Sequence, residues 1–162
     1  MEKKKILMCD LDGVVFDFDE GMAELAPDLY LGEGDDYEKR SKMVDEICQN
    51  NPTIFHNLKP LPGAIEAVKE LMFYYDVYFL STPMEAVPES FTGKKICLNK
   101  YFGNLCSKKL ILTHRKDLVI GDYLIDDRTR NGAGEFTGEL IQFATEKYPN
   151  WDSVLKYLID KI

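Results

Sequence analysis

Hydrophobic and polar positions alternate along this chain in a way that predicts a parallel α/β fold. Short apolar runs typical of buried strands cover residues 5–9, 77–80, 110–112, 123–125 and 140–143. Apolar residues recur every three or four positions elsewhere, which predicts helices over residues 17–28, 37–49, 62–71, 89–101 and 151–162. Because strands that alternate with helices pair in parallel, we expect a three-layer core around a central parallel sheet.

One helical stretch, between the first and second strands, interrupts this alternation. Residues 17–60 carry two amphipathic helices and then a loop that Pro60 and Pro62 close. We expect this insertion to form a small helical cap over the mouth of the sheet. Residues 1–16 and 61–162 would then form the catalytic core. Pro62 predicts the first turn of the helix that follows, where a missing N–H costs nothing.

Composition and charge narrow the class of protein. The chain has 162 residues, which favours one domain, and 45% of them are hydrophobic, enough for a core. A net charge of −8 disfavours nucleic-acid polymers and anionic membranes as partners, and no apolar run is long enough to span a bilayer. Four cysteines without CxxC spacing predict neither a zinc site nor disulfides, so we expect reduced thiols in a cytoplasmic protein.

Polar clusters follow four of the predicted strands. They are Asp10 with Asp12, Ser81 with Thr82, residues 113–116 ending in Lys116, and Asp126 with Asp127. Because the carboxyl ends of parallel strands meet at one edge of a sheet, we expect these side chains to converge. The alternatives are that these residues have no functional role: the acids would be isolated and solvated, Ser81 would cap a helix, and Lys116 would face solvent.

This combination of groups suits phosphoryl transfer. Asp10 can attack phosphorus in line, and Asp12 can protonate the leaving alcohol and later deprotonate water. Ser81, Thr82 and Lys116 can bind the phosphate oxygens. The carboxylates after the fourth strand, Asp126 and Asp127, complete with Asp10 an oxygen-only site of the kind that Mg²⁺ prefers.

Asp10-Leu11-Asp12-Gly13-Val14, Ser81, Lys116 and Asp126-Asp127 resemble, in order, the four motifs of the haloacid dehalogenase superfamily. Within it, the chain is most similar to the 5′(3′)-deoxyribonucleotidase family. That likeness covers nearly the whole chain and rests on the segments DLDGVVFDF (10–18), LKPLPGAIEAVKEL (58–71), STP (81–83), KYFG (100–103), LTHRK (112–116) and DYLIDDR (122–128).

The resemblance implies a haloacid dehalogenase-like core of Rossmann type with a small cap. It implies a Mg²⁺-dependent phosphatase that acts on deoxyribonucleoside 5′(3′)-monophosphates through an aspartyl-phosphate. Asp10 would be the nucleophile and a metal ligand, and Asp12 the general acid/base and a ligand through its backbone carbonyl. Asp127 would be the third protein ligand, with Asp126 orienting water or a neighbouring group.

The resemblance also implies a slot for the nucleobase, lined by Phe18 and Phe55, although both rings could equally pack the cap on the core. The chain departs from the animal members of the family, which carry a tryptophan pair in the cap. Its only tryptophan, Trp151, lies near the C-terminus. Tyr30 and Tyr37 are candidates to replace the pair, and base preference stays open.

Two other functions remain as alternatives. The first is a phosphatase of the same superfamily for another small phosphomonoester, such as a sugar phosphate, since the cap alone contacts the non-reacting part of the substrate. The second is a nucleotide binder without turnover, which would be expected to lack Asp10 or Asp12. In each case the partner is a small phosphorylated molecule, and a homodimer is left open.

Overall fold

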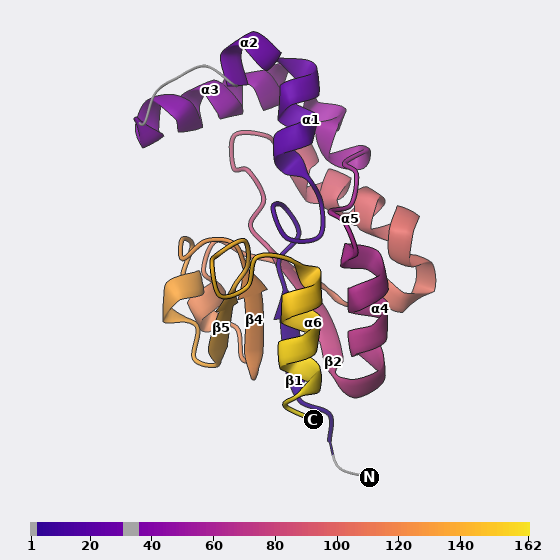
Figure 1. Ribbon diagram of the computed structural model, residues 1–162. Coiled ribbons are helices and arrows are strands. Elements are labelled where there is room, and N and C mark those ends of the chain that lie inside the picture. The colour runs from indigo at the N-terminus through magenta and orange to yellow at the C-terminus, as the bar shows by residue number, and fades with distance from the viewer. Residues whose placement is uncertain (1–2, 31–35) are drawn as a thin grey trace.

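The computed structural model describes residues 3–30 and 36–162, and within these ranges a five-stranded sheet forms the centre of the molecule (Figure 1). The sheet has the order β3-β2-β1-β4-β5, and every neighbouring pair is parallel. Its strands are β1 (Ile6–Cys9), β2 (Asp76–Ser81), β3 (Leu110–Leu112), β4 (Tyr123–Asp126) and β5 (Glu139–Gln142). The predicted parallel sheet is confirmed, with each strand end within one residue of its expected position.

The strand order places a ligand crevice beside β1. The chain builds β2 and β3 on one side of β1, and then returns to add β4 and β5 on the other side. Ligands of such sheets bind beyond the carboxyl ends of the strands where the order reverses, here β1 and β4. The Asp10 backbone N–H donates to the Ile125 carbonyl at 2.9 Å, so the end of β1 lies level with the end of β4.

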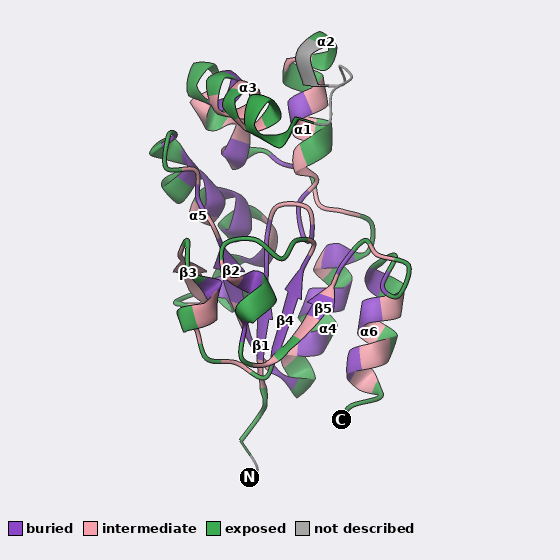
Figure 2. Cartoon of the chain, turned by 90° about the vertical axis from the view of Figure 1, so that its left-hand side faces the viewer, coloured by how far each residue is buried: buried purple, intermediate pink, exposed green. Residues whose placement is uncertain are grey.

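Different structures cover the two faces of the sheet (Figure 2). The helices α4 (Ala64–Tyr74), α5 (Glu89–Phe102) and α6 (Trp151–Ile159) share one hydrophobic core with alternate strand residues such as Phe79. The opposite face packs instead against the short 3-10 turn η4 (Ala133–Glu135). Two more 3-10 turns are η2 (Gly103–Cys106) and η3 (Lys116–Leu118). Among the described residues, no helix has both the length and the apolar character needed to cross a bilayer.

The segment predicted as a cap lies beyond the carboxyl ends of the strands (Figure 1). It contains α1 (Phe18–Leu25), α2 (Pro27–Tyr30), α3 (Tyr37–Asn50) and the 3-10 turn η1 (Pro52–His56). Its buried side chains, Met22, Ile47, Cys48 and Phe55, belong to the same hydrophobic core as the helices below. The segment is therefore packed onto the core rather than around a separate interior, and its limits at residues 17 and 60 stay a prediction.

Several helix ends differ from the predictions, among them that of α6, which lies at Ile159 rather than at residue 162, and two of the differences have a local reason. The helix expected from Pro62 begins at Ala64, because Gly63 has a φ of +74°, which a right-handed helix does not allow. The helix expected over residues 17–28 ends at Leu25, since the proline at position 27 cannot donate the next helical hydrogen bond. The loop expected over residues 50–61 contains the turn η1.

Gly93 provides a test of how tightly the cap segment is packed on α5. A Cβ atom at this position would lie 2.7 Å from the Phe55 Cβ and 3.0 Å from the His56 Cδ2. We expect Gly93→Ala to lower the free energy of unfolding by about 1–3 kcal/mol, because overpacking displaces η1. Glycine-to-alanine changes inside helices usually stabilise by up to about 1 kcal/mol, so the sign is diagnostic.

Urea unfolding measures this difference, with Thr92→Ala as the control on the exposed side of the same helix. The control should stay within about 0.5 kcal/mol of the parent. A Gly93→Ala protein as stable as the parent would show that η1 is not closely packed on α5.

Candidate active site

A cavity of about 960 Å³ lies between the cap segment and the carboxyl ends of the strands. Every side chain predicted for the site lines it: Asp10, Asp12, Phe18, Phe55, Ser81, Thr82, Lys116, Asp126 and Asp127. The structure therefore brings together residues from β1, the cap segment, β2, η3 and β4. The roles assigned to them stay predictions.

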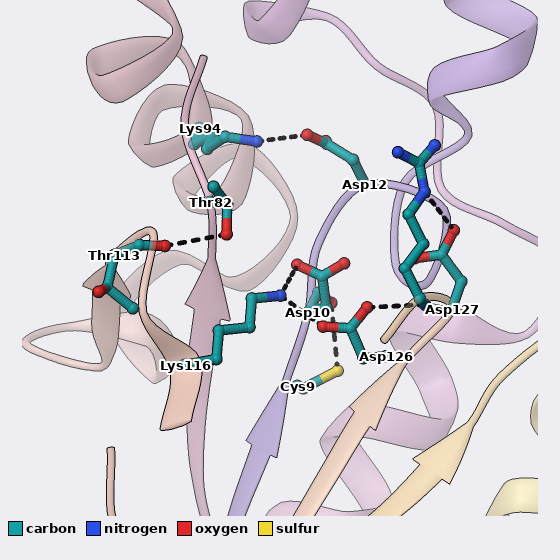
Figure 3. Close-up of polar contacts among 10 residues, drawn as sticks. Cys9, Asp10, Asp12, Thr82, Lys94, Thr113, Lys116, Asp126 and Asp127 are labelled. Carbon is teal, nitrogen blue, oxygen red and sulfur yellow. Dashed lines mark hydrogen bonds and ion pairs between the residues drawn. The ribbon is translucent and has the colours of Figure 1, made fainter. Parts of the chain in front are cut away.

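Lys116 is buried between two carboxylates at the floor of the cavity (Figure 3). Its Nζ lies 3.1 Å from Asp10 Oδ1 and 2.5 Å from Asp126 Oδ2. Burial alone would lower the pKa of Lys116, but the Asp10 and Asp126 carboxylates outweigh it and raise that pKa. The lysine is therefore a charged interior group, and the alternative of a solvent-facing side chain is wrong.

Three carboxylates stand close enough to share one cation. Oxygen atoms of Asp10, Asp126 and Asp127 all lie within 4.8 Å of one another. The second oxygen of Asp126 accepts a hydrogen bond from the Arg128 backbone N–H at 3.0 Å, so both of its oxygens have protein partners. The Asp127 carboxylate pairs with the Arg128 side chain at 3.6 Å.

Gly13 permits this approach of the two acidic loops. It has a φ of +78°, and a Cβ built on it would lie 2.5 Å from Asp127 Oδ2. A side chain here would push the Asp127 carboxylate away from Asp10, so the glycine after Asp12 is required by the close approach as well as by the turn.

Burial makes the acidic group reluctant to ionise. It raises the pKa of Asp10 from 3.8 to about 7, with Lys116 opposing the change and the neighbouring carboxylates adding to it. Burial and the Asp10 charge likewise raise the pKa of Asp127 to about 6. A cation placed among these oxygens would favour their ionised forms.

Asp12 points away from the other carboxylates and toward the cap segment. It forms an ion pair with Lys94, which is buried in α5 (Figure 3). The Lys94 Nζ also lies 5.1 Å from the centroid of the Phe55 ring. The side chain of Asp12 is therefore held apart from the three-carboxylate group.

The hydroxyl residues after β2 have different surroundings. Ser81 is buried at the end of the strand. The Thr82 hydroxyl donates to the Thr113 carbonyl at 2.9 Å, so its proton joins the loops after β2 and β3 and is engaged with the protein rather than with a ligand.

Aromatic side chains form part of the cavity wall. The rings of Phe18 and Phe55 are stacked, with centroids 5.7 Å apart and planes 15° apart. Phe55 is buried in the core and Phe18 is partly exposed, so each packs and lines the cavity at once. The Tyr37 ring also lines the cavity, with the Arg130 Cζ 3.4 Å from its centroid. The Tyr30 side chain lies outside the described residues.

Residues 4–150 match the family described as 5′ nucleotidase, deoxy (pyrimidine), cytosolic type C protein. The chain belongs to this nucleotidase family. A protein of Vibrio phage KVP40 with the provisional name 5′(3′)-deoxyribonucleotidase is 43% identical over 155 residues, which cover 96% of this chain and 85% of that protein. A protein of the same provisional name from Staphylococcus aureus Mu50 is 37% identical over 129 residues, 74% of this chain and 70% of that protein.

Solved structures show the same fold at low identity. A dehalogenase with an intermediate complex superposes with a TM-score of 0.61 at 11% identity, over 100% of this chain and 98% of that one. YfnB of Bacillus subtilis, a provisionally described haloacid dehalogenase-type hydrolase bound to magnesium, gives 0.50 at 12% identity, over 92% and 90% of the two chains. This nucleotidase thus has a haloacid dehalogenase-like core. Its family and its relatives make it an enzyme of the phosphatase class.

Sequence analysis missed Lys94, although the helix pattern held a signal for it. The buried positions of α5 include Ser90, Gly93, Cys97 and Leu98, and Lys94 lies on the same stripe. A lysine on the buried face of a helix needs a carboxylate partner, because an unpaired interior charge is costly. The pattern could not show that this partner is Asp12, which is 82 residues away.

The Lys94–Asp12 pair in this nucleotidase predicts unequal effects of removing either partner. The Lys94 side chain is 1% exposed and that of Asp12 is 25% exposed. Asp12→Asn should destabilise the protein by about 3–5 kcal/mol, because it leaves a buried cation unpaired. Lys94→Met should cost less, since the remaining carboxylate reaches water and methionine fills the space.

Urea unfolding of both variants, and of the Asp12→Asn/Lys94→Met double variant, measures the difference. The double variant should be more stable than Asp12→Asn alone. Equal losses in the two single variants would contradict a buried ion pair at this position.

The raised pKa values of Asp10 and Asp127 predict how pH affects the metal-free enzyme. Between about pH 4 and 7 the folded protein holds protons that the unfolded chain has released, so stability falls as pH rises through this window. The thermal midpoint in EDTA should therefore decrease from pH 5 to pH 8, and by less in Asp127→Asn. A variant with the same slope as the parent would show that Asp127 does not contribute.

Proposed function

We propose that this protein is a Mg²⁺-dependent phosphatase that hydrolyses deoxyribonucleoside 5′(3′)-monophosphates through a phosphorylated Asp10. The observation that carries the proposal is the position of Asp10 at the floor of the cavity, with one oxygen held by Lys116 at 3.1 Å and the carboxylates of Asp126 and Asp127 beside it. The second oxygen of Asp10 is the one we assign to the attack.

The reaction then divides into two displacements. Asp10 attacks phosphorus, the bond to the leaving alcohol breaks, and Asp12 gives the alcohol its proton. Water next attacks the phosphorus of the aspartyl-phosphate, Asp12 takes the water's proton, and the bond between phosphorus and Asp10 breaks, which releases phosphate and restores the Asp10 carboxylate. The ion pair with Lys94 holds Asp12 on the cap side, where a leaving nucleoside would lie. Lys116, the Ser81 hydroxyl and the Thr82 backbone N–H offset charge on the phosphate oxygens.

The acidic residues suit a magnesium ion in both donor type and spacing. Carboxylate oxygens are hard donors, and those of Asp10, Asp126 and Asp127 lie within 4.8 Å of one another. We assign Asp10, Asp127 and the Asp12 carbonyl as ligands. Asp126 keeps Lys116 in place, because it is already bonded to that ammonium. When bound, the ion would neutralise negative charge on the phosphate.

A nucleotide accounts for the aromatic part of the cavity. The partly exposed Phe18 ring offers a face for a nucleobase, and Phe55 supports it from behind. The names of the relatives agree with a nucleotide substrate. A sugar phosphate would leave this ring uncovered. The free cysteines of this chain, Cys9, Cys48, Cys97 and Cys106, support a reducing, cytoplasmic setting.

Phosphate release tests the proposal on deoxyribonucleoside 5′- and 3′-monophosphates, ribonucleotides and sugar phosphates, with and without EDTA. We expect deoxyribonucleotides to give the highest kcat/KM, EDTA to abolish turnover, and added Mg²⁺ to restore it. Asp10→Asn should lose at least about 10³-fold in kcat while remaining folded.

Asp45→Asn, at another carboxylate in the cavity wall, is the matched control for the loss of one negative charge. It should retain catalysis at a rate much nearer the parent's. Higher kcat/KM for sugar phosphates would replace the nucleotide assignment. Nucleotide-induced thermal stabilisation without hydrolysis would show that the protein binds nucleotides and does not hydrolyse them. Turnover by Asp10→Asn at the parent rate would show that Asp10 is not the nucleophile.

A further inference from the structure

Trp151 connects the C-terminal helix to the loop that follows the proposed nucleophile. It is the first residue of α6, it is buried, and it also lines the cavity. Its indole Nε1 donates a hydrogen bond of 2.8 Å to the carbonyl of Val14, 137 residues away in sequence. Residues 4–150 match the family, so Trp151 lies just outside the matched segment.

The bond is made to a tight turn that carries Asp12. The N–H groups of Val14, Val15 and Phe16 all donate to the Leu11 carbonyl, at 3.1, 2.8 and 2.9 Å. The Gly13 N–H donates to the Phe16 carbonyl at 2.9 Å and closes the turn from the other side. Asp12 lies inside this turn, so its position follows that of the backbone around it.

Two carbonyls of the turn are held by donors from outside it. The Leu61 N–H binds the Val15 carbonyl at 2.8 Å, and the indole binds that of Val14. Val14 is fully buried, so its carbonyl would have to turn toward another donor if the indole were removed. A change in the orientation of the Val14 peptide group would shift the backbone two residues earlier, at Asp12.

The indole itself is fixed by its own surroundings. Asn150 and Ser153 form a capping box at the start of α6, with the Ser153 N–H donating to the Asn150 side chain at 3.0 Å. The Trp151 ring packs against Phe143 with centroids 5.5 Å apart. The donor is therefore presented by a rigid element that is independent of the turn.

We propose that Trp151 is a positioning residue, which through the Val14 carbonyl keeps the Asp12 carboxylate aligned with the leaving group. The inference rests on the proposed phosphatase mechanism, in which Asp12 protonates that group. A misplaced acid slows the departure of a poor leaving group such as a nucleoside. It matters less for p-nitrophenolate, which departs without a proton.

The test compares Trp151→Phe, which keeps an aromatic ring and removes the N–H, with Tyr75→Phe. The Tyr75 hydroxyl donates to the Leu158 carbonyl of the same helix at 2.7 Å, is buried and does not line the cavity. Each variant thus removes one buried hydrogen bond to α6, and only one of these bonds reaches the Asp12 turn. Circular dichroism confirms that both are folded at the assay temperature.

With the deoxyribonucleotide that the parent hydrolyses fastest, kcat/KM of Trp151→Phe should fall roughly 10- to 100-fold. With p-nitrophenyl phosphate, kcat/KM should remain close to the parent's, because it covers only the steps up to departure of p-nitrophenolate and not the later attack of water, in which Asp12 also acts. Tyr75→Phe should match the parent on both substrates. An equal loss on both substrates, an equal loss in Tyr75→Phe, or no loss in Trp151→Phe would overturn the positioning role.

A second measurement does not depend on turnover. Amide hydrogen exchange followed by NMR should show faster exchange at Gly13 and Phe16 in Trp151→Phe, and not in Tyr75→Phe. Unchanged exchange there would overturn the inference even if the enzyme is active. If the parent protein had no phosphatase activity but the exchange pattern were as expected, the result would count against the proposed function. It would still show that the Trp151 indole stabilises the turn.

Discussion

The ammonium group of Lys116 is the interaction on which the rest of the site depends. It is buried between the carboxylates of Asp10 and Asp126, and a third carboxylate, that of Asp127, lies within 4.8 Å of both. Without the Lys116 ammonium, these buried negative charges would repel one another where water cannot screen them. Even with the Lys116 ammonium in place, burial keeps the pKa values of Asp10 and Asp127 high, because one ammonium does not compensate all of the negative charge that the ionised carboxylates would carry. The site is thus suited to receive a cation.

The sheet makes this concentration of charge possible. β1 lies between β2 and β4, so acids that follow β1 and end β4 are neighbours although more than a hundred residues separate them. Lys116 reaches the same point from the turn after β3. The backbone has room for the approach because Gly13 presents no side chain to Asp127. Register, strand order and one glycine together produce the three-carboxylate group.

Helix α5 links the chemistry to the cap segment. Lys94 pairs with Asp12 and lies beside the Phe55 ring, and Gly93 lets η1 pack directly on the helix. The position of the cap aromatics and the direction of Asp12 are therefore coupled through one turn of helix. A substrate that contacts Phe18 would press on the same packed side chains that orient Asp12. The non-reacting part of a substrate could in this way affect the position of the proposed acid.

The sequence alone determined the parallel sheet and the set of polar residues at its carboxyl edge. Strands buried on both faces are recognisable as continuous apolar runs, and the residue after such a run has to lie at the strand's end. Only the tertiary structure decided the partners: Lys94 for Asp12, Asp126 for Lys116, and Trp151 for the Val14 carbonyl. Gly63 likewise moved the start of α4 through a backbone angle that composition does not reveal. Periodicity shows which positions are buried, but the side chain that each one meets depends on how distant segments pack.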